Sequence, residues 1–340
     1  MNRLMCAVLA LVAMQIPSQV SAQQVTDGTV VKLGRWDTFG GELVSNGIVK
    51  SLLGDLGYKV EVSSLSPAPF YKALGQGDVD LWDGGTWPNH AAMFAAIKDT
   101  AVVLGDGTII GGGVNAILID KKTAEEHHIT HLEQFSDPKI AKIFDTDGDG
   151  KADLYQCDFG WGCANIVDFY IKSLKLEPNV KSVQAKWDML MADTVAKFQR
   201  GEPVMYYAWA PSWITHKLQP GRDVVWLQID SKDLPAAMQD GTDVRGSSPG
   251  IAGCAGGSDP CEIGAPWNNK MIANKAFADA HPGVSKMLAE MKWSLETWSA
   301  WEDAINDGAK SDADFRRLAD EWIASNKVTY DAWLKVGASK

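Results

Sequence analysis

The order of strand and helix patterns after residue 28 is the feature that most constrains the fold. The chain shows a strand pattern at TVVKLGRW, helical periodicity at GELVSNGIVKSLLGDLGY, a strand at KVEVSSL, a helix and turn at PAPFYKALGQGD and a strand at DVDLWDG. This β-α-β-α-β order predicts an α/β domain with a largely parallel sheet. Ligands of such sheets bind in the loops that follow the carboxyl ends of the strands. Trp36 and the stretch WDGGTWPNH, Trp82 to His90, both fall at such ends.

Alternating patterns continue through the middle of the chain and predict a second lobe. A length of 340 residues is enough for two ordinary domains. After residue 262 the pattern becomes mainly helical. We expect two α/β lobes with a cleft between them. Residues 23–112 would form the first part of lobe I, 113–245 lobe II, and 246–340 the return to lobe I.

The first 22 residues predict a secretory signal peptide. They contain Arg3, an apolar run through Met14 and a small-x-small ending at Val20 to Ala22, which favours cleavage before Gln23. The apolar run is too short to span a bilayer comfortably. We therefore expect an exported protein of the periplasm.

The net charge makes nucleic acid an unfavourable partner. The formal charge is -11, and removal of Arg3 with the signal peptide would make it -12. A polyanion would be repelled, and no basic stripe interrupts the acidic balance.

Four cysteines follow the signal peptide, and an even count in an oxidising compartment favours disulfides. Three pairings are possible. The short glycine-containing loops CDFGWGC and CAGGSDPC favour Cys157 with Cys163 and Cys254 with Cys261. A zinc site is the weaker alternative because neither pair has CxxC spacing.

The segment DTDGDGKAD has the spacing of a calcium-binding loop. Acidic residues occupy positions 1, 3, 5 and 9, the carbonyl of residue 151 would fill position 7, and Gly150 permits the sharp turn. Position 12 is Gln156 in place of a bidentate Glu. The alternative is a solvated Asp/Gly turn without an ion. The expected ligands to a structural calcium ion are Asp145, Asp147, Asp149, Lys151 and Asp153.

Several tryptophans lie next to Gly or Pro at expected strand ends. Tryptophans on helices usually belong to the core, whereas Trp87, Trp161 and Trp209 fall in loop-like sequence. Aromatic faces attract a cation that has no hydrogen bond to donate. These residues therefore predict a box for a quaternary ammonium group.

The segments DTDGDGKADLYQCDFGWGC, MADTVAKFQRGEPVMYYAWAPSW and GRDVVWLQ resemble the periplasmic glycine betaine/proline betaine-binding proteins of ABC transporters. The resemblance covers nearly the whole mature chain. It implies a two-lobed binding protein of type II without catalysis, a monomer that works with a membrane permease and its ATPase. It also implies that Trp87, Trp161 and Trp209 form the ammonium box. The backbone NH groups of Gly162 and Cys163, with His90, would hold a ligand carboxylate.

One spacing departs from the family pattern. Three residues separate the first Trp from the His in the family, whereas TWPNH leaves two, so whether His90 reaches a carboxylate is open. The extra aromatics Trp36, Trp82 and Trp267 suggest a narrower pocket, which favours trimethylamine N-oxide slightly over glycine betaine. Glu42 is a candidate donor to an N-oxide oxygen if it is neutral. The alternative is a solvated acid in the first turn of a helix.

Two other functions remain as alternatives. The first is a choline or proline betaine binder of the same family. The second is a secreted enzyme acting on methylated amines, for which the sequence offers no convincing acid/base or redox set. The GSSPG segment lacks the strand and helix that a nucleophile elbow requires. We therefore expect a binding protein and not an enzyme.

Overall fold

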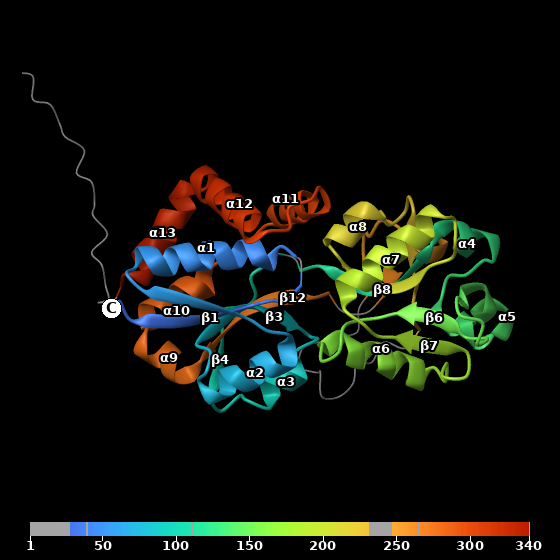
Figure 1. Ribbon diagram of the computed structural model, residues 1–340, viewed down its shortest axis with the longest axis horizontal. Coiled ribbons are helices and arrows are strands. Elements are labelled where there is room, and N and C mark those ends of the chain that lie inside the picture. The colour runs from blue at the N-terminus through green and yellow to red at the C-terminus, as the bar shows by residue number, and fades with distance from the viewer. Residues whose placement is uncertain (1–27, 39, 111, 231–246, 264–265, 340) are drawn as a thin grey trace, which may run out of the picture.

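The computed structural model describes residues 28–38, 40–110, 112–230, 247–263 and 266–339. The described elements form two lobes that lie side by side (Figure 1). None of the described helices has the length and apolar character needed to cross a bilayer. The predicted signal peptide lies outside the described residues.

The first lobe is built on a five-stranded sheet with the order β2-β1-β3-β12-β4. Strands β1, β2 and β3 are parallel, as the sequence predicts, whereas β12 is antiparallel to both β3 and β4. The strands are β1 (Val30–Arg35), β2 (Lys59–Ser64), β3 (Leu81–Trp87), β4 (Ala101–Leu104) and β12 (Asn268–Asn274). The helices are α1 (Glu42–Asp55), α2 (Pro67–Gln76), α3 (Ala91–Ala95), α9 (Lys275–Ala280), α10 (Pro282–Glu290), α11 (Leu295–Asn306), α12 (Asp312–Ser325) and α13 (Lys327–Gly337).

Helical periodicity explains how α1 covers this sheet. Val44, Ile48 and Leu52 recur every four residues and are fully buried. Such spacing places apolar side chains on one face of a helix. On the outer side of the lobe, α12 and α13 pack against α1, in accord with the mainly helical C-terminal pattern (Figure 1).

The second lobe repeats the design with the order β7-β6-β8-β5-β9. Strand β6 is parallel to β7 and β8, and β5 is antiparallel to β8 and β9. The strands are β5 (Val114–Asp120), β6 (Ala152–Tyr155), β7 (Val180–Val183), β8 (Met205–Ala210) and β9 (Val224–Trp226). The α-helices are α4 (Lys121–Glu126), α5 (Pro138–Ala141), α6 (Gly162–Ser173), α7 (Trp187–Gln199) and α8 (Trp213–Lys217), with short 3-10 turns at η1 (Leu132–Ser136) and η2 (Lys142–Phe144).

The chain crosses between the lobes in two segments that pair with each other. Gly113 N donates to Trp267 O (2.7 Å), and Trp267 N donates to Gly113 O (2.9 Å). A Cβ at residue 113 would lie 2.4 Å from the Trp267 ring, so only glycine fits beneath the indole. The chain therefore returns to the first lobe directly before β12, which begins at Asn268.

The predicted boundary at residue 246, where the chain would return to lobe I, lies too early in the sequence. The segment that holds β10 (Ser247–Ser248), η4 (Ala255–Gly257) and β11 (Cys261–Glu262) is bound to the second lobe. Trp226 N donates to Gly253 O (2.8 Å), and Ile229 N donates to Glu262 O (2.8 Å). Sequence periodicity does not reveal this backbone pairing with Trp226 of β9 and Ile229 just after it.

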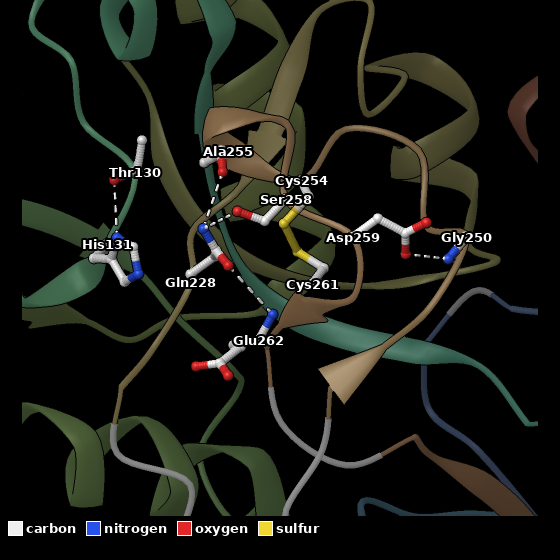
Figure 2. Close-up of a disulfide and its surroundings, with 10 residues drawn as sticks. All are labelled: Thr130, His131, Gln228, Gly250, Cys254, Ala255, Ser258, Asp259, Cys261 and Glu262. Atoms are coloured by element: carbon white, nitrogen blue, oxygen red, sulfur yellow. Dashed lines mark hydrogen bonds between the residues drawn. A yellow bond between two sulfur atoms is a disulfide. The ribbon is translucent and has the colours of Figure 1, made fainter.

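Both predicted disulfides are confirmed. Cys157 is bonded to Cys163, and Cys254 to Cys261. Figure 2 shows how the buried Gln228 side chain fixes the second of these loops. Its Nε2 donates to Ala255 O and Ser258 Oγ, both at 3.1 Å.

Polar contacts join the lobes beside the cleft. Lys186, just before α7, lies 3.0 Å from Asp37 of the first lobe and 2.9 Å from Asp158 of its own lobe. Thr38 Oγ1 donates to Asp188 Oδ2 across the lobes (2.6 Å). Next to this contact, Trp213 Nε1 of α8 donates to Asp188 Oδ1 (3.3 Å), and α8 contacts α11 of the first lobe through the His216–Asp303 pair.

These contacts should bias the protein toward the closed arrangement. The Thr38→Val and Lys186→Ala variants should have lobes that lie further apart on average, measured by Förster transfer between one label on each lobe. An exposed ion pair contributes about 0.2–1 kcal/mol, and a hydrogen bond to a carboxylate about 1.5–3 kcal/mol. Thr38→Ser should retain the native separation, and Lys172→Ala, an exposed change on α6, should have no effect. Unchanged transfer in both variants would contradict this role.

Candidate ligand-binding site

A cavity lies between the lobes and draws its wall from both of them. The volume of this cavity is about 40 Å³. Hollows of about 360 Å³ beside α1 and α12 and about 470 Å³ beside α4 are larger, but neither is walled by tryptophan. The cavity wall consists of Trp36, Thr38, Glu42, Thr86, Asn89, His90 and Trp267 with Asn115, Trp161, Cys163, Tyr207 and Trp209.

Aromatic rings from the two lobes meet at the cavity. The Trp36 ring lies 4.9 Å from the Trp161 ring at an interplanar angle of 78°. Trp161 lies 6.0 Å from Trp209, which is backed by Trp187 at 4.3 Å. Trp36 Nε1 donates to Gly84 O (3.0 Å), which fixes the orientation of the indole. A Cβ at Gly84 would lie 2.2 Å from that nitrogen, so the glycine makes room for the ring.

Two tryptophans that the sequence placed at the site, Trp82 and Trp87, lie outside the cavity wall. The structure extends β3 through Trp87, so WDGGTW is strand and not loop, and its tryptophans are buried. The Trp82 ring lies behind the wall, 5.9 Å from Trp36 and 5.7 Å from His90. Trp87 contacts Phe94, with Lys270 over its ring. Trp82 therefore supports the wall from behind, and Trp87 packs away from it.

Gly162 and Cys163 begin α6 at the cavity. Cys163 belongs to the wall and Gly162 does not. A Cβ at residue 162 would lie 1.8 Å from Asn89 O, so the glycine allows the first turn of α6 to approach the other lobe. This close approach brings the lobes together beside the cavity.

His90 belongs to the wall as a neutral side chain. Burial lowers the pKa of His90 to about 3. Thr86 N donates to His90 Nδ1 (3.0 Å), so the imidazole proton resides on Nε2. The ring lies nearly parallel to those of Trp36 and Trp82, at centroid distances of 6.0 and 5.7 Å. His90 can therefore donate one neutral hydrogen bond through Nε2.

Three carboxyl groups lie on the lobe I side of the cavity; Asp83 and Glu302 are buried, and Glu42 is partly buried. Burial raises the pKa of Glu42, which is part of the wall, to about 7, although Asn269 Nδ2 donates to it (2.9 Å). Burial and the charge of Glu42 raise the pKa of Glu302 to about 8. Burial raises the pKa of Asp83 to about 6 despite hydrogen bonds from Ser45 (2.5 Å) and Asn46 (3.0 Å). Glu42 is thus an enclosed acid at the cavity and not a solvated residue of the first helical turn.

Five polar residues of the wall were not predicted from the sequence. Thr86 and Asn89 lie within the stretch from Trp82 to His90, which the sequence already indicated, and Tyr207 shares the strand face of Trp209. Thr38 and Asn115 come from segments whose position at the cavity only the fold establishes. The five residues are Thr38, Thr86, Asn89, Asn115 and Tyr207.

The acidic loop between η2 and β6 brings oxygen ligands together. Ligand atoms of Asp145, Asp147 and Asp149 lie within 4.8 Å of one another. Asp145 accepts hydrogen bonds from Gly148 N (2.7 Å) and Gly150 N (2.9 Å). These carboxylates fit the oxygen preference of calcium. However, Lys181 Nζ lies 2.5 Å from Asp147, 2.8 Å from Asp149 and 2.9 Å from Asp153, so an ion would have to displace this ammonium group.

The model of the family described as "Substrate binding domain of ABC-type glycine betaine transport system" matches residues 30–325. The chain belongs to this family. It is 36% identical over 289 residues to the glycine betaine-binding periplasmic protein of Dickeya dadantii, covering 84% of this chain and 83% of that protein. It is also 36% identical over 290 residues to the glycine betaine/proline betaine-binding periplasmic protein of Salmonella typhimurium, covering 85% and 84%.

Solved structures share the fold at lower sequence identity. The glycine betaine, L-proline-binding protein of Borrelia burgdorferi matches with a TM-score of 0.67 at 14% identity, covering 91% of this chain and all of that one. The two-lobed α/β fold expected from the sequence is therefore confirmed. Family membership also favours a transport role over catalysis.

The buried carboxyl groups should make the protein less stable as pH rises. Their pKa values in the folded protein are about 6, 7 and 8, above the ordinary 3.8 for Asp83 and 4.5 for Glu42 and Glu302. Folding therefore favours their protonated forms, and this contribution is lost between about pH 4 and pH 8. Thermal unfolding should show a lower Tm at pH 8 than at pH 6.

Glu302→Gln should reduce this dependence because an amide of the same shape carries no charge. Glu296→Gln, an exposed change on the same helix, serves as the control and should keep the wild-type pH slope. An identical slope in the wild type and Glu302→Gln would show that Glu302 does not titrate in this range.

Proposed function

We propose that this protein is the periplasmic solute-binding component of an ABC importer for a small methylated ammonium osmolyte. The observation that carries the proposal is the aromatic cavity between the lobes in a chain of this family. The signal-peptide pattern, the two disulfides and the periplasmic relatives support the location. Release to a membrane permease driven by its ATPase would complete transport, with the binding protein acting as a monomer.

Trp36, Trp161, Trp209 and Trp267 form the ammonium box in this proposal. Methylated nitrogen has no proton to donate, so ring faces and apolar contact supply its binding energy. Trp267 Nε1 donates to Val114 O (3.1 Å) and Ala210 O (3.3 Å), which orients its ring. This set replaces Trp87, named by the resemblance, with residues that face the cavity.

The polar part of the wall favours trimethylamine N-oxide slightly over glycine betaine. No side chain of the described wall is a lysine or arginine, and His90 is neutral. A betaine carboxylate would meet neutral donors only, and an ionised Glu42 would repel it. A protonated Glu42 can instead donate to an N-oxide oxygen. The small volume of the cavity also favours the shorter ligand.

Calorimetric titration with trimethylamine N-oxide, glycine betaine, choline and proline betaine tests this function. The N-oxide should bind most tightly, and Trp209→Ala should weaken it by about 1 to 3 kcal/mol through lost cation-π and apolar contact. Trp322→Ala, outside the cavity wall, is the matched control for tryptophan loss. Glycine betaine binding tenfold tighter than the N-oxide, with the preference lost in His90→Ala, would restore the ligand and histidine role implied by the resemblance.

An enzyme acting on methylated amines would turn the ligand over. Recovery of intact ligand after long incubation supports transport binding. Any turnover product would contradict it.

We also propose that the acidic loop binds calcium as a structural ion. The ligands would be side-chain oxygens of Asp145, Asp147, Asp149 and Asp153 with the carbonyl of Lys151. Asp153 is held toward the loop because its Oδ2 accepts from Thr146 N (2.9 Å) and Thr146 Oγ1 (2.5 Å). The ion would neutralise the negative charge of these carboxylates, which Lys181 otherwise balances through ion pairs.

Calcium should raise the Tm of chelator-stripped protein, since a ligand of the folded state stabilises it by mass action. Lys181→Ala should bind calcium about tenfold more tightly because no ammonium group competes for the carboxylates. Lys151→Ala keeps the backbone carbonyl and serves as the control. Calorimetry that detects no calcium binding in either the wild type or Lys181→Ala would contradict the site.

A further inference from the structure

Four polar atoms of the described cavity wall are buried and lack a hydrogen-bond partner: Asn89 Oδ1, Trp161 Nε1, Tyr207 Oη and Asn115 Nδ2. Tyr207 and Asn115 lie on the adjacent strands β8 and β5. Buried polar groups are nearly always paired because leaving one without a partner costs free energy. Tyr207 Oη and Asn115 Nδ2 can both donate, and both belong to the second lobe. The cavity thus contains unused donors among its tryptophans.

Strand geometry brings these two residues together. Tyr207 and Trp209 are two positions apart on β8, so they share one face of the sheet. Asn115 on β5 lies directly opposite Trp209 in the antiparallel register. Directly opposed residues also share a face. Tyr207 and Asn115 therefore flank Trp209 on the side that faces the cavity.

We propose that Asn115 and Tyr207 bind the ligand oxygen while the tryptophans bind its methylated nitrogen. This inference rests on the proposed function and adds the residues that recognise the oxygen. The resemblance instead assigned that role to His90 and the backbone of Gly162 and Cys163. This oxygen is that of an N-oxide or of a carboxylate, since both accept two or more hydrogen bonds.

The Tyr207 hydroxyl is suited to donate. Burial raises the pKa of Tyr207, so the hydroxyl stays protonated throughout the physiological range. The polar side chain of Asn89 approaches the Tyr207 hydroxyl and lowers its pKa in part, without forming a hydrogen bond with it. Asn89 Oδ1 also has no hydrogen-bond partner. Trp187 Nε1 donates to Tyr207 O (3.2 Å), which holds the strand in place at this residue. The side chain is thus held at the cavity with its proton available.

The neighbouring tyrosine offers a matched control. Tyr206 is also fully buried, and its hydroxyl is also unpaired. It points to the opposite face of β8 and is not part of the cavity wall. Tyr206→Phe and Tyr207→Phe therefore remove the same atom from the same strand, but only Tyr207→Phe removes it from the cavity.

The test measures the affinity of wild type, Tyr206→Phe, Tyr207→Phe and Asn115→Ala for trimethylamine N-oxide, glycine betaine and tetramethylammonium. Tetramethylammonium has the methylated nitrogen and no oxygen. Tyr207→Phe and Asn115→Ala should each weaken the oxygen-containing ligand by about tenfold or more, as expected for a hydrogen bond to a charged acceptor. Both should change tetramethylammonium affinity less than about twofold. Tyr206→Phe should leave all affinities near those of wild type.

Two results would overturn the assignment. Equal losses for tetramethylammonium and the oxygen-containing ligands would show that Tyr207 and Asn115 only shape the cavity. Unchanged affinity for every ligand would show that neither residue contacts the oxygen. Wild-type protein that binds none of the three ligands would instead contradict the proposed function itself, so the two failures are distinguishable.

Discussion

The paired crossing segments at Gly113 and Trp267 are the constraint on which the rest of the structure depends. Their two backbone hydrogen bonds join the lobes at one point, and the Trp267 indole above Gly113 forms part of the cavity wall. Strand β5 follows Gly113 and strand β12 follows Trp267, so each crossing segment leads into a different sheet. Each of these strands is antiparallel to its neighbours in its own sheet. The same contact therefore sets where the lobes meet and closes one side of the binding cavity.

Closure around this point removes polar groups from water as well as aromatic ones. The enclosed acids Glu42 and Glu302 have raised pKa values because their charged forms are poorly solvated there. A well-paired protein interior would avoid such groups, since each costs stability when it ionises. Their position beside a cavity with unpaired donors fits a site arranged for a polar ligand, at the expense of stability in the empty protein.

Local cross-links add to the hydrophobic core in holding loops of the second lobe. The disulfide between Cys157 and Cys163 fixes the loop that carries Trp161, and Cys254–Cys261 with Gln228 fixes a loop at the edge of the second sheet. The acidic loop is held by Lys181 and its own backbone amides. These contacts lie within the second lobe, so opening depends on the separate contacts between the lobes.

The sequence by itself determined the elements and the short-range features. The β-α-β-α-β order, the two disulfides and the resemblance to the betaine-binding family follow from patterns a few residues long, and the structure and comparisons confirm them. Trp36, His90, Trp161 and Trp209 were found in this way and line the cavity. Only the tertiary structure decided that β3 continues through Trp87, that Trp82 lies behind the cavity wall, that residues 247–263 stay with the second lobe, and that Asn115 lies beside Tyr207. Those facts depend on which strands pair across long stretches of chain, and local periodicity carries no information about such pairing.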